Sequence, residues 1–208
     1  MDYKNLLLED LIIYHKGGGW GKESEFQDST LVNVIRGTDF SRIFEGDISE
    51  VPLRYEKNDS VVKRECRPHD VLIEISGGSA SKGQFVGRVF FITEDILKRF
   101  THPVIPASFC RLMRFNEDLI DPRYAYFYLR NMYLNETISI YEVQSTGISN
   151  FQFTDFISHE SIPVPSLEIQ KSVVKKIGAI EDISLGLYKE AGDYKLLNNT
   201  LILKYFGD

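Results

Sequence analysis

The chain has 208 residues, 43% of them hydrophobic, and contains 14 Phe and 11 Tyr, a composition that can fill a sizeable core and excludes a disordered protein. Its net charge of −6 argues against a protein that simply coats nucleic acid. The two cysteines lack CxxC spacing, which argues against a disulfide scaffold and for a reducing, cytoplasmic location. Neither a signal peptide nor an apolar run of the roughly 20 residues that a membrane helix needs is found, so we expect no membrane contact.

The stretch KGGGWGKE (16–23) raises the question of nucleotide binding. A phosphate-binding P-loop needs four residues between its glycines and ends in Gly-Lys-Ser/Thr. Here only three residues separate Gly17 from Gly21, and Glu23, whose carboxylate would repel a phosphate, occupies the hydroxyl position. The stretch therefore predicts a tight glycine turn, anchored to the core by Trp20, and not a nucleotide site.

Short runs of β-branched and aromatic residues, bounded by Gly, Pro and Asp, predict strands over much of the first 160 residues. A helix is predicted at 121–134, because Asp121 can cap its first turn, Pro122 suits that turn, and an aromatic and leucine face follows. The two prolines of IPVP (162–165) then mark a boundary. The predicted strands are LVNVIR (31–36), DVLIEIS (70–76), RVFFIT (88–93) and ASFCRLMRF (107–115).

Residues at alternating steps of four and three after Pro165 form a mostly apolar seam that predicts one long helix in a coiled coil. The repeat is sustained over more than four heptads, and no second helix follows to pack on it, so this face is expected to meet a partner. A helix folded back on its own domain is the alternative. We therefore expect two units, 1–165 and 166–208. The seam positions are Val173, Ile177, Ile180, Ser184, Leu187, Ala191, Tyr194, Asn198, Leu201 and Tyr205.

The sequence lacks readable motifs for catalysis or metal binding. The four histidines are far apart and lack metal-ligand spacing. Asp70 and Glu74 resemble a nuclease carboxylate pair, but Ser76 stands where the lysine of such a site would be. No GxSxG elbow and no Asn/Asp-Pro-Pro-Tyr/Phe motif occurs. We expect a non-catalytic binding module with no cofactor and no metal; an enzyme whose site assembles through space is the alternative.

Four stretches, in this order, resemble the specificity subunit of type I restriction-modification systems. They are LEDLIIYHKGGGWGKE (8–23), VIRGTDF (34–40), CRPHDVLIEISGGS (66–79), in which His69 replaces a glycine of the family motif, and the block 144–177. The last is the most specific. Its order of Ser-Thr-Gly, Ile-Pro-Val-Pro, Glu-Ile-Gln and a long helix is similar to the segment that connects the recognition domain to the spacer helix in the family. The resemblance covers nearly the whole chain.

The resemblance implies an α+β fold, with a β-rich target recognition domain followed by a long C-terminal coiled-coil spacer helix. Family members usually carry two recognition domains and two spacer helices, whereas this chain shows one of each. It therefore implies a half-sized subunit that forms a homodimer through antiparallel helices and reads an inverted repeat in double-stranded DNA. The helix contacts would be Val173, Ile177, Ile180, Leu187, Tyr194 and Leu201.

The partners that the resemblance implies are a modification (methyltransferase) subunit, which methylates adenine, and a restriction subunit, joined through the complex. The chain itself would catalyse nothing and would bind no cofactor. An interaction or decoy subunit of the same complex, which does not read DNA, is the alternative.

Candidate DNA-contact residues lie in loops between the predicted strands, where the side chains have the donors and acceptors that pair with base edges. The main candidates come from the stretch 77–88, for which a flexible hairpin loop is the alternative. Others come from the segment around 37–42 and, as a contact to the DNA backbone, from the glycine turn. The full set is Lys22, Arg36, Thr38, Ser79, Lys82, Gln84 and Arg88.

Overall fold

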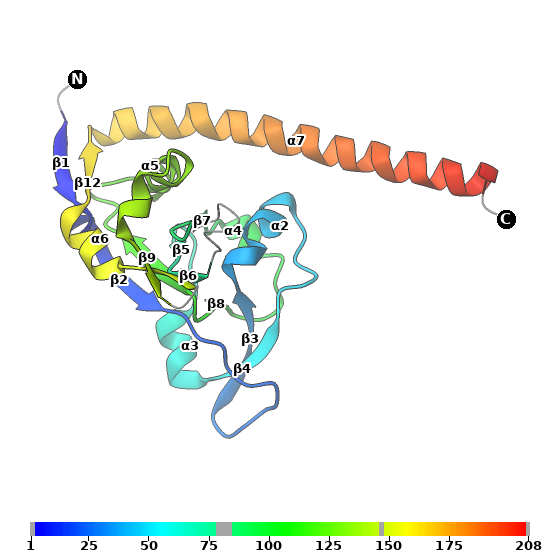
Figure 1. The fold of residues 1–208 in the computed structure, drawn as a ribbon, viewed down its shortest axis with the longest axis horizontal. Coiled ribbons are helices and arrows are strands. Elements are labelled where there is room, and N and C mark those ends of the chain that lie inside the picture. Colours follow the sequence, from blue (N-terminus) through cyan, green and yellow to red (C-terminus); the bar gives the residue numbers. More distant parts are fainter. Residues whose placement is uncertain (1–2, 78–84, 146–147, 207–208) are drawn as a thin grey trace.

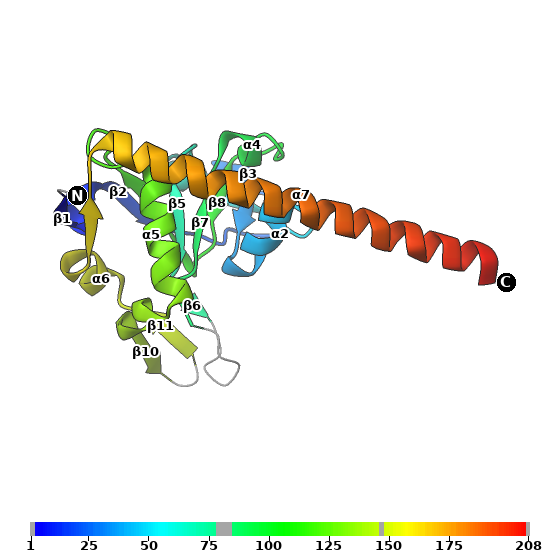
Figure 2. The same ribbon diagram turned by 90° about the horizontal axis from the view of Figure 1, so that it is seen from above.

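A folded body of strands and short helices carries one long C-terminal helix, as Figure 1 shows for this computed structural model. The structure describes residues 3–77, 85–145 and 148–206, and it describes side chains as far as Glu190, apart from those of Ser145, Leu185, Tyr188 and Lys189. The long helix crosses the body and extends well beyond it (Figures 1 and 2). The N-terminal strand lies beside the start of this helix (Figure 1).

A four-stranded antiparallel sheet forms the centre of the body, in the order β2-β9-β5-β7. Successive side chains of a strand point to opposite faces of a sheet, and here both faces are buried. Val71 and Ile73 pack into one apolar cluster, and Leu72 packs into another. The sheet is therefore a rigid base for the loops at its edges. Its strands are β2 (Ile12–Gly17), β5 (Val71–Glu74), β7 (Val89–Phe91) and β9 (Cys110–Phe115).

Three helices cover the first face of the central sheet: α1 (Leu8–Leu11), α5 (Pro122–Leu134) and α6 (Phe153–His159). Helix α5 begins as predicted. The carboxylate of Asp121 accepts hydrogen bonds from the backbone amides of Arg123 (2.9 Å) and Tyr124 (3.2 Å), which satisfies two amides that have no partner within the helix.

A second, mixed sheet has the order β4-β3-β8, with β3 antiparallel to β4 and parallel to β8. The carboxyl end of β3 leads directly into the segment 36–39. This segment meets the central sheet, where Gly37 lies against Glu74 of β5. The elements of this region are β3 (Ser29–Ile35), the 3-10 turn η1 (Gly37–Asp39), α2 (Phe40–Glu45), β4 (Leu53–Lys57), α3 (Asn58–Arg64), α4 (Glu94–Leu97) and β8 (Val104–Pro106).

Two small antiparallel sheets connect distant parts of the chain. One has the order β10-β11-β6, and the other pairs β1 with β12 so that Lys4 lies opposite Val164. The second pairing brings the start of the chain next to the point where it enters the long helix. The elements are β1 (Lys4–Leu7), β6 (Ser76–Gly77), the 3-10 turn η3 (Thr137–Tyr141), β10 (Glu142–Ser145), β11 (Ile148–Phe151) and β12 (Ser161–Val164).

Strands occur in all four predicted runs, but their bounds differ. The run 70–76 forms two strands, because the backbone of Ile75 leaves the ladder and bonds instead to Phe109 and Phe151. The run 107–115 is a strand only from Cys110 onward. None of the helices in the described part of the chain contains an apolar stretch that could span a lipid bilayer.

The long helix α7 (Leu167–Phe206) is anchored to α5 along its first turns. The buried amide of Gln170 accepts a hydrogen bond from the backbone of Asp121 (2.7 Å) and donates one to the carbonyl of Pro165 (2.8 Å). Further along, the carboxylate of Glu181 forms ion pairs with Arg123 (3.3 Å) and Arg130. These contacts place one face of α7 on the folded body.

A different face of α7 carries the predicted seam, and its described members are largely exposed. Val173 is half-buried, whereas 68% of Ile180 and 63% of Leu187 is accessible to solvent. At about 100° per residue, these positions lie roughly a quarter turn away from Gln170. The side chains of Tyr194 and Leu201 lie outside the described residues. The helix thus packs on its own domain with a face that combines Gln170 and Glu181 with the apolar Val174, and it leaves the seam residues Ile180 and Leu187 exposed.

Candidate functional site

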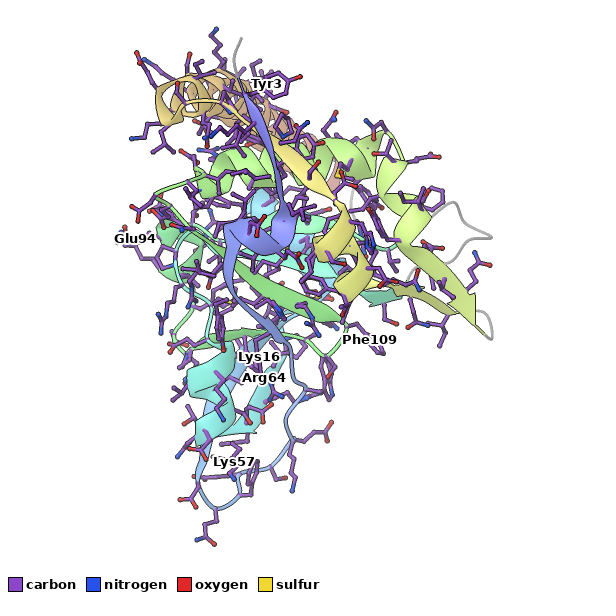
Figure 3. All side chains as sticks on the ribbon, turned by 90° about the vertical axis from the view of Figure 1, so that its left-hand side faces the viewer. Tyr3, Lys16, Lys57, Arg64, Glu94 and Phe109 are labelled. Atoms are coloured by element: carbon purple, nitrogen blue, oxygen red, sulfur yellow. The ribbon has the colours of Figure 1, made fainter. Side chains whose placement is uncertain are left out.

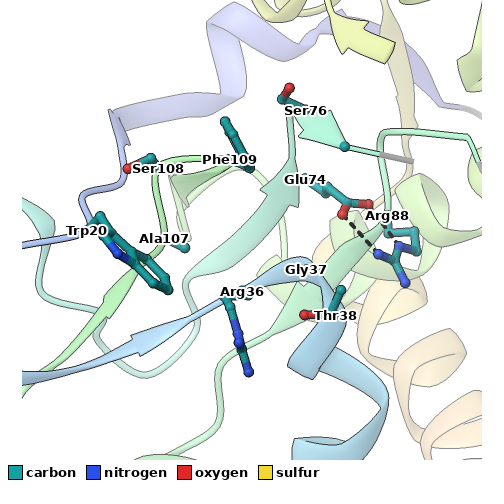
Figure 4. Close-up of a pocket in the computed structure, with 11 residues that line it drawn as sticks. Trp20, Arg36, Gly37, Thr38, Glu74, Ser76, Arg88, Ala107, Ser108 and Phe109 are labelled. Atoms are coloured by element: carbon teal, nitrogen blue, oxygen red, sulfur yellow. Dashed lines mark hydrogen bonds and ion pairs between the residues drawn. The ribbon is translucent and has the colours of Figure 1, made fainter. Parts of the chain in front are cut away.

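A cavity of about 530 Å³ opens between the central sheet, the segment after β3 and the loop before β9 (Figure 4). Its walls come from segments that are far apart in the sequence and that the two sheets bring together. It combines charged, hydroxyl and aromatic side chains. The lining residues are Trp20, Arg36, Gly37, Thr38, Glu74, Ser76, Gly77, Arg88, Ala107, Ser108 and Phe109.

An ion pair between Glu74 and Arg88 forms one wall of the cavity (Figure 4). The guanidinium binds the carboxylate with two hydrogen bonds, Nε to Oε2 (2.8 Å) and Nη2 to Oε1 (2.9 Å). These bonds, together with the charge of Glu74, raise the pKa of Arg88 despite its partial burial. Only 5% of Glu74 is exposed, so the arginine neutralises a carboxylate that would otherwise be buried without a partner.

Arg36 contributes a second guanidinium with a carboxylate partner. Its Nε and Nη2 donate to Asp39 at 2.9 and 2.8 Å, and Nη2 also donates to the carbonyl of Glu50 (2.9 Å). Arg42 shares the same carboxylate at 3.0 Å. Burial acts to raise the pKa of Asp39, but the hydrogen bonds from Arg36 and Arg42 outweigh it and hold that pKa below its ordinary value.

Two aromatic side chains are exposed at the cavity. Phe109 is 61% exposed and Trp20 is 40% exposed. The prediction that Trp20 anchors the glycine turn to the core is therefore wrong; its ring lies against the guanidinium of Arg54 (5.0 Å) and faces the cavity. Figure 3 shows Phe109 on the face of the molecule that also carries Lys16.

The glycine-rich stretch 16–23 allows close contact between backbones beside the cavity. The amides of Gly18 and Gly19 donate to the carbonyls of Cys110 (3.0 Å) and Pro106 (2.9 Å). A Cβ atom at Gly18 would lie 2.1 Å from the carbonyl oxygen of Ala107, so only glycine fits. The prediction of a tight turn is wrong, because the backbone makes no turn from Gly18 to Gly21 and continues from β2. Its contacts instead position the loop 106–110, which supplies Ser108 and Phe109 to the cavity.

The structure brings together three of the predicted DNA-contact residues: Arg36, Thr38 and Arg88 all line the cavity. Lys22 does not. It forms an isolated bridge with Tyr55, and its ammonium lies 4.7 Å from the centre of the Phe26 ring. The remaining three, Ser79, Lys82 and Gln84, lie outside the described residues. They belong to the segment that follows Gly77 at the cavity edge.

Four further side chains line the cavity that were not expected from the sequence: Trp20, Ser76, Ser108 and Phe109. One signal was present, since the alternation of apolar residues in 107–115 breaks at Phe109. No comparable sequence signal marks the serines, because their place depends on which loops the two sheets bring together.

The carboxylates that suggested a nuclease site are both used by arginines. Asp70 is fully buried and accepts two hydrogen bonds of 2.8 Å from Arg114, and Glu74 is bound by Arg88. Among the side chains that the structure describes, which end at Glu190, no group of three or more from His, Cys, Asp or Glu is placed to hold a metal ion.

The chemistry of the cavity suits a ligand with a polar edge and a flat apolar face. In Arg36 and Arg88 the Nη1 amino groups make no hydrogen bond within the described part of the chain, and hydroxyl groups and aromatic rings lie beside them. Because both guanidiniums already have carboxylate partners, the lining offers hydrogen bonds more than net positive charge.

The chain matches the family model described as Type I restriction modification DNA specificity domain over residues 2–191. This match spans most of the chain, which is therefore a DNA specificity domain by family. The protein belongs to the specificity subunits of type I restriction-modification systems. Comparison with curated proteins gave no match.

Three solved structures share the fold. The type I S subunit from M. genitalium aligns with a TM-score of 0.67 at 12% identity, over 100% of this chain and 46% of that one. A second match is a chain from a structure titled for complex assembly and conformational transition of the type I R-M system. It aligns with a TM-score of 0.60 at 19% identity, over 96% of this chain and 43% of that one. The HsdS subunit from Thermoanaerobacter tengcongensis has a TM-score of 0.53, 16% identity, and coverage of 99% and 45%. The chain thus spans a little under half the length of these proteins.

Proposed function

We propose that this chain reads the base sequence of double-stranded DNA and directs a type I restriction-modification complex to its site. The observation that carries the proposal is the cavity in a domain of this family, where Arg36, Thr38 and Arg88 from separate segments lie together. Base edges carry hydrogen-bond donors and acceptors above a flat apolar ring, which is the ligand chemistry that the cavity suits.

The free Nη1 group of Arg88 and the hydroxyls of Thr38, Ser76 and Ser108 would contact base edges. Arginine pairs best with the two acceptors of guanine, and an aromatic side chain such as Phe109 contacts the methyl group of thymine. The segment that continues from Gly77 would add Ser79, Lys82 and Gln84, of which Gln84 suits adenine.

Catalysis would belong to the partners. The modification subunit would methylate adenine and flip out its target base, the restriction subunit would join through the complex, and this chain would need no cofactor. The net charge of −6 supports this division, since partner subunits can supply many of the phosphate contacts on which affinity for DNA depends.

Two copies would pair through α7 into an antiparallel homodimer and read an inverted repeat. The exposed apolar face that includes Ile180 and Leu187 supports this arrangement, because a row of large apolar side chains on a helix is stabilised by packing against a second helix. The paired helices would separate the two recognition bodies by a fixed distance, which predicts a site of two half-sites with an unspecified spacer.

The test is methylome sequencing of cells that carry this gene with its modification subunit. A methylated adenine motif made of two inverted half-sites supports the proposal. Matched cells with Thr38→Ala and Phe109→Ala should lose or relax specific positions of that motif. If the chain co-purifies with the modification subunit but no adenine motif appears, it is an interaction or decoy subunit.

A further inference from the structure

Arg111, on the central strand β9, has no carboxylate partner within the described residues. Its Nε atom is buried and makes no hydrogen bond. Burial lowers the pKa of this guanidinium. By contrast, the two cavity arginines and Arg114, its neighbour on β9, are each neutralised by a carboxylate. Burying part of a charged guanidinium without an anionic partner costs free energy in the free protein. This cost indicates that an anion binds to Arg111 when the protein is in use.

Two neighbours hold Arg111 in place. Its Nη1 lies 3.1 Å from Nδ1 of His15 on the adjacent strand β2, and its guanidinium lies over the ring of Phe153, 4.4 Å from the ring centre. The imidazole of His15 packs against the same ring, with 5.3 Å between centroids. One ring at the start of α6 therefore supports both nitrogen-bearing groups, and His15 is exposed to solvent.

We infer that Arg111 and His15 form a binding site for a phosphodiester group of the DNA backbone. This inference rests on the proposed function and deepens it. A planar guanidinium fixed by stacking is suited to two hydrogen bonds with phosphate oxygens, and a protonated imidazole beside it adds a further donor.

The position of the pair fits this role. Arg111 follows Phe109, which borders the cavity, by only two residues, and Gly17 of the glycine-rich stretch 16–23 lies opposite Arg111 across β2 and β9. A phosphate held by Arg111 would thus set the register of the duplex against the base-reading cavity. Phosphate contacts position a protein on DNA, whereas base contacts specify the sequence.

The inferred site is coupled to proton binding. An arginine can only donate, so in the free protein Nδ1 of His15 accepts from Arg111 and carries no proton. Burial, followed by the charges of Arg111 on β9 and Lys16 on its own strand, lowers the pKa of His15. From α6, the uncharged ring of Phe153 faces it. A bound phosphodiester adds negative charge, which raises that pKa and allows both the guanidinium of Arg111 and the protonated imidazole of His15 to donate to it.

The sign of the pH effect follows from this change. The pKa of His15 is higher in the complex than in the free protein, so between the two values the complex binds a proton that the free protein lacks. Affinity for DNA therefore rises as the pH falls through this window.

The first test measures the binding of a fluorescent duplex of arbitrary sequence to the full chain by anisotropy, between about 50 and 200 mM salt. Arg111→Met keeps much of the packing on Phe153 and removes the charge. A plot of the logarithm of the association constant against the logarithm of the salt concentration has a negative slope. The variant should reduce the magnitude of this slope by about 1, which is the effect of losing one phosphate contact. Lys98→Met removes one exposed, distant cation that pairs with Glu94, and it should leave the slope unchanged.

The second test follows proton uptake. Wild-type affinity should rise as the pH falls toward 6, the ordinary range of histidine, and both His15→Gln and Arg111→Met should abolish much of this rise. Urea unfolding should show that Arg111→Met is folded. A variant that binds with the wild-type slope and pH dependence overturns the phosphate site and leaves the proposed function standing. A wild-type chain that binds no duplex at low salt also overturns the phosphate site, whereas the proposed function is decided separately by whether a methylated adenine motif appears in the cells.

Discussion

The guanidinium of Arg88 and the carboxylate of Glu74 bind each other through two hydrogen bonds of 2.8 and 2.9 Å at the wall of the cavity. Glu74 also leaves no room for a side chain at Gly37, where a Cβ atom would lie 2.3 Å from its Oε1. The carboxylate therefore joins three segments, β5, the start of β7 and the turn after β3. Arg88 thus has a structural partner as well as a candidate role in DNA recognition.

Arg88→Ala should lower the free energy of unfolding by roughly 2–3 kcal/mol, because it leaves a buried carboxylate without its partner. Urea unfolding monitored by circular dichroism gives the measurement.

The double variant Glu74→Gln/Arg88→Ala is the matched control, since a neutral amide is far less costly to bury than a lone carboxylate. It should recover most of the lost stability. Loss of the methylation motif in the double variant would then report on DNA recognition alone, and equal stability of the two variants would contradict the structural role of the pair.

Because of Asp39, the free energy of unfolding should depend on pH in the acid range. The folded pKa of Asp39 is held below the ordinary value by Arg36 and Arg42, so the unfolded chain binds a proton at a pH where the folded chain does not. The contribution to stability is present above the unfolded pKa of about 3.9 and is lost as the pH falls through the folded pKa.

Asp39→Asn should cost about 2 kcal/mol at neutral pH, through weakened hydrogen bonds to charged groups. The difference in stability between wild type and variant should shrink as the pH falls from about 5. Unfolding by urea at a series of pH values measures this difference. A difference that stays constant with pH would show that Asp39 does not titrate with folding.

Gly18 and Gly186 form a matched pair of glycine positions. Gly18→Ala should destabilise the protein by at least about 2 kcal/mol, because the new Cβ would meet the backbone of Pro106 and Ala107 at 2.3 and 2.1 Å. Gly186→Ala on α7 meets nothing within 4 Å and should increase helix stability by about 0.5–1 kcal/mol. Thermal unfolding and helicity compare the two, and equal effects would contradict the close approach at Gly18.

Ile180 should be a contact of the proposed homodimer. Ile180→Lys replaces a large exposed apolar residue twice per dimer and should raise the dissociation constant by at least about tenfold. Ala179→Lys places the same charge on an exposed neighbour that points away from the seam and should change the constant little. Sedimentation equilibrium of the pure chains measures both. A monomeric wild type at micromolar concentration would rule out self-association without the modification subunit.

Local signals in the sequence were sufficient to predict several elements. The Asp121-Pro122 start of α5 involves only neighbouring residues, so its cap could be inferred directly. The strand runs were visible because β-branched and aromatic residues bounded by Gly, Pro and Asp mark them. A strand such as β5, which is buried on both faces, is a continuous apolar run. The heptad pattern likewise predicted the α7 helix, since its period depends only on helix geometry.

The sequence by itself determined the helix that begins at Asp121-Pro122, the long helix after Pro165, strands within four runs and the resemblance to the specificity subunits. Only the tertiary structure decided that Arg36, Thr38 and Arg88 share one cavity, that Trp20 faces it, and which face of α7 packs on the body. These features depend on pairing between residues far apart in the chain, as in the contact of Gly37 with Glu74. Local periodicity holds no information about such contacts, because they are set by how sheets and loops pack in space.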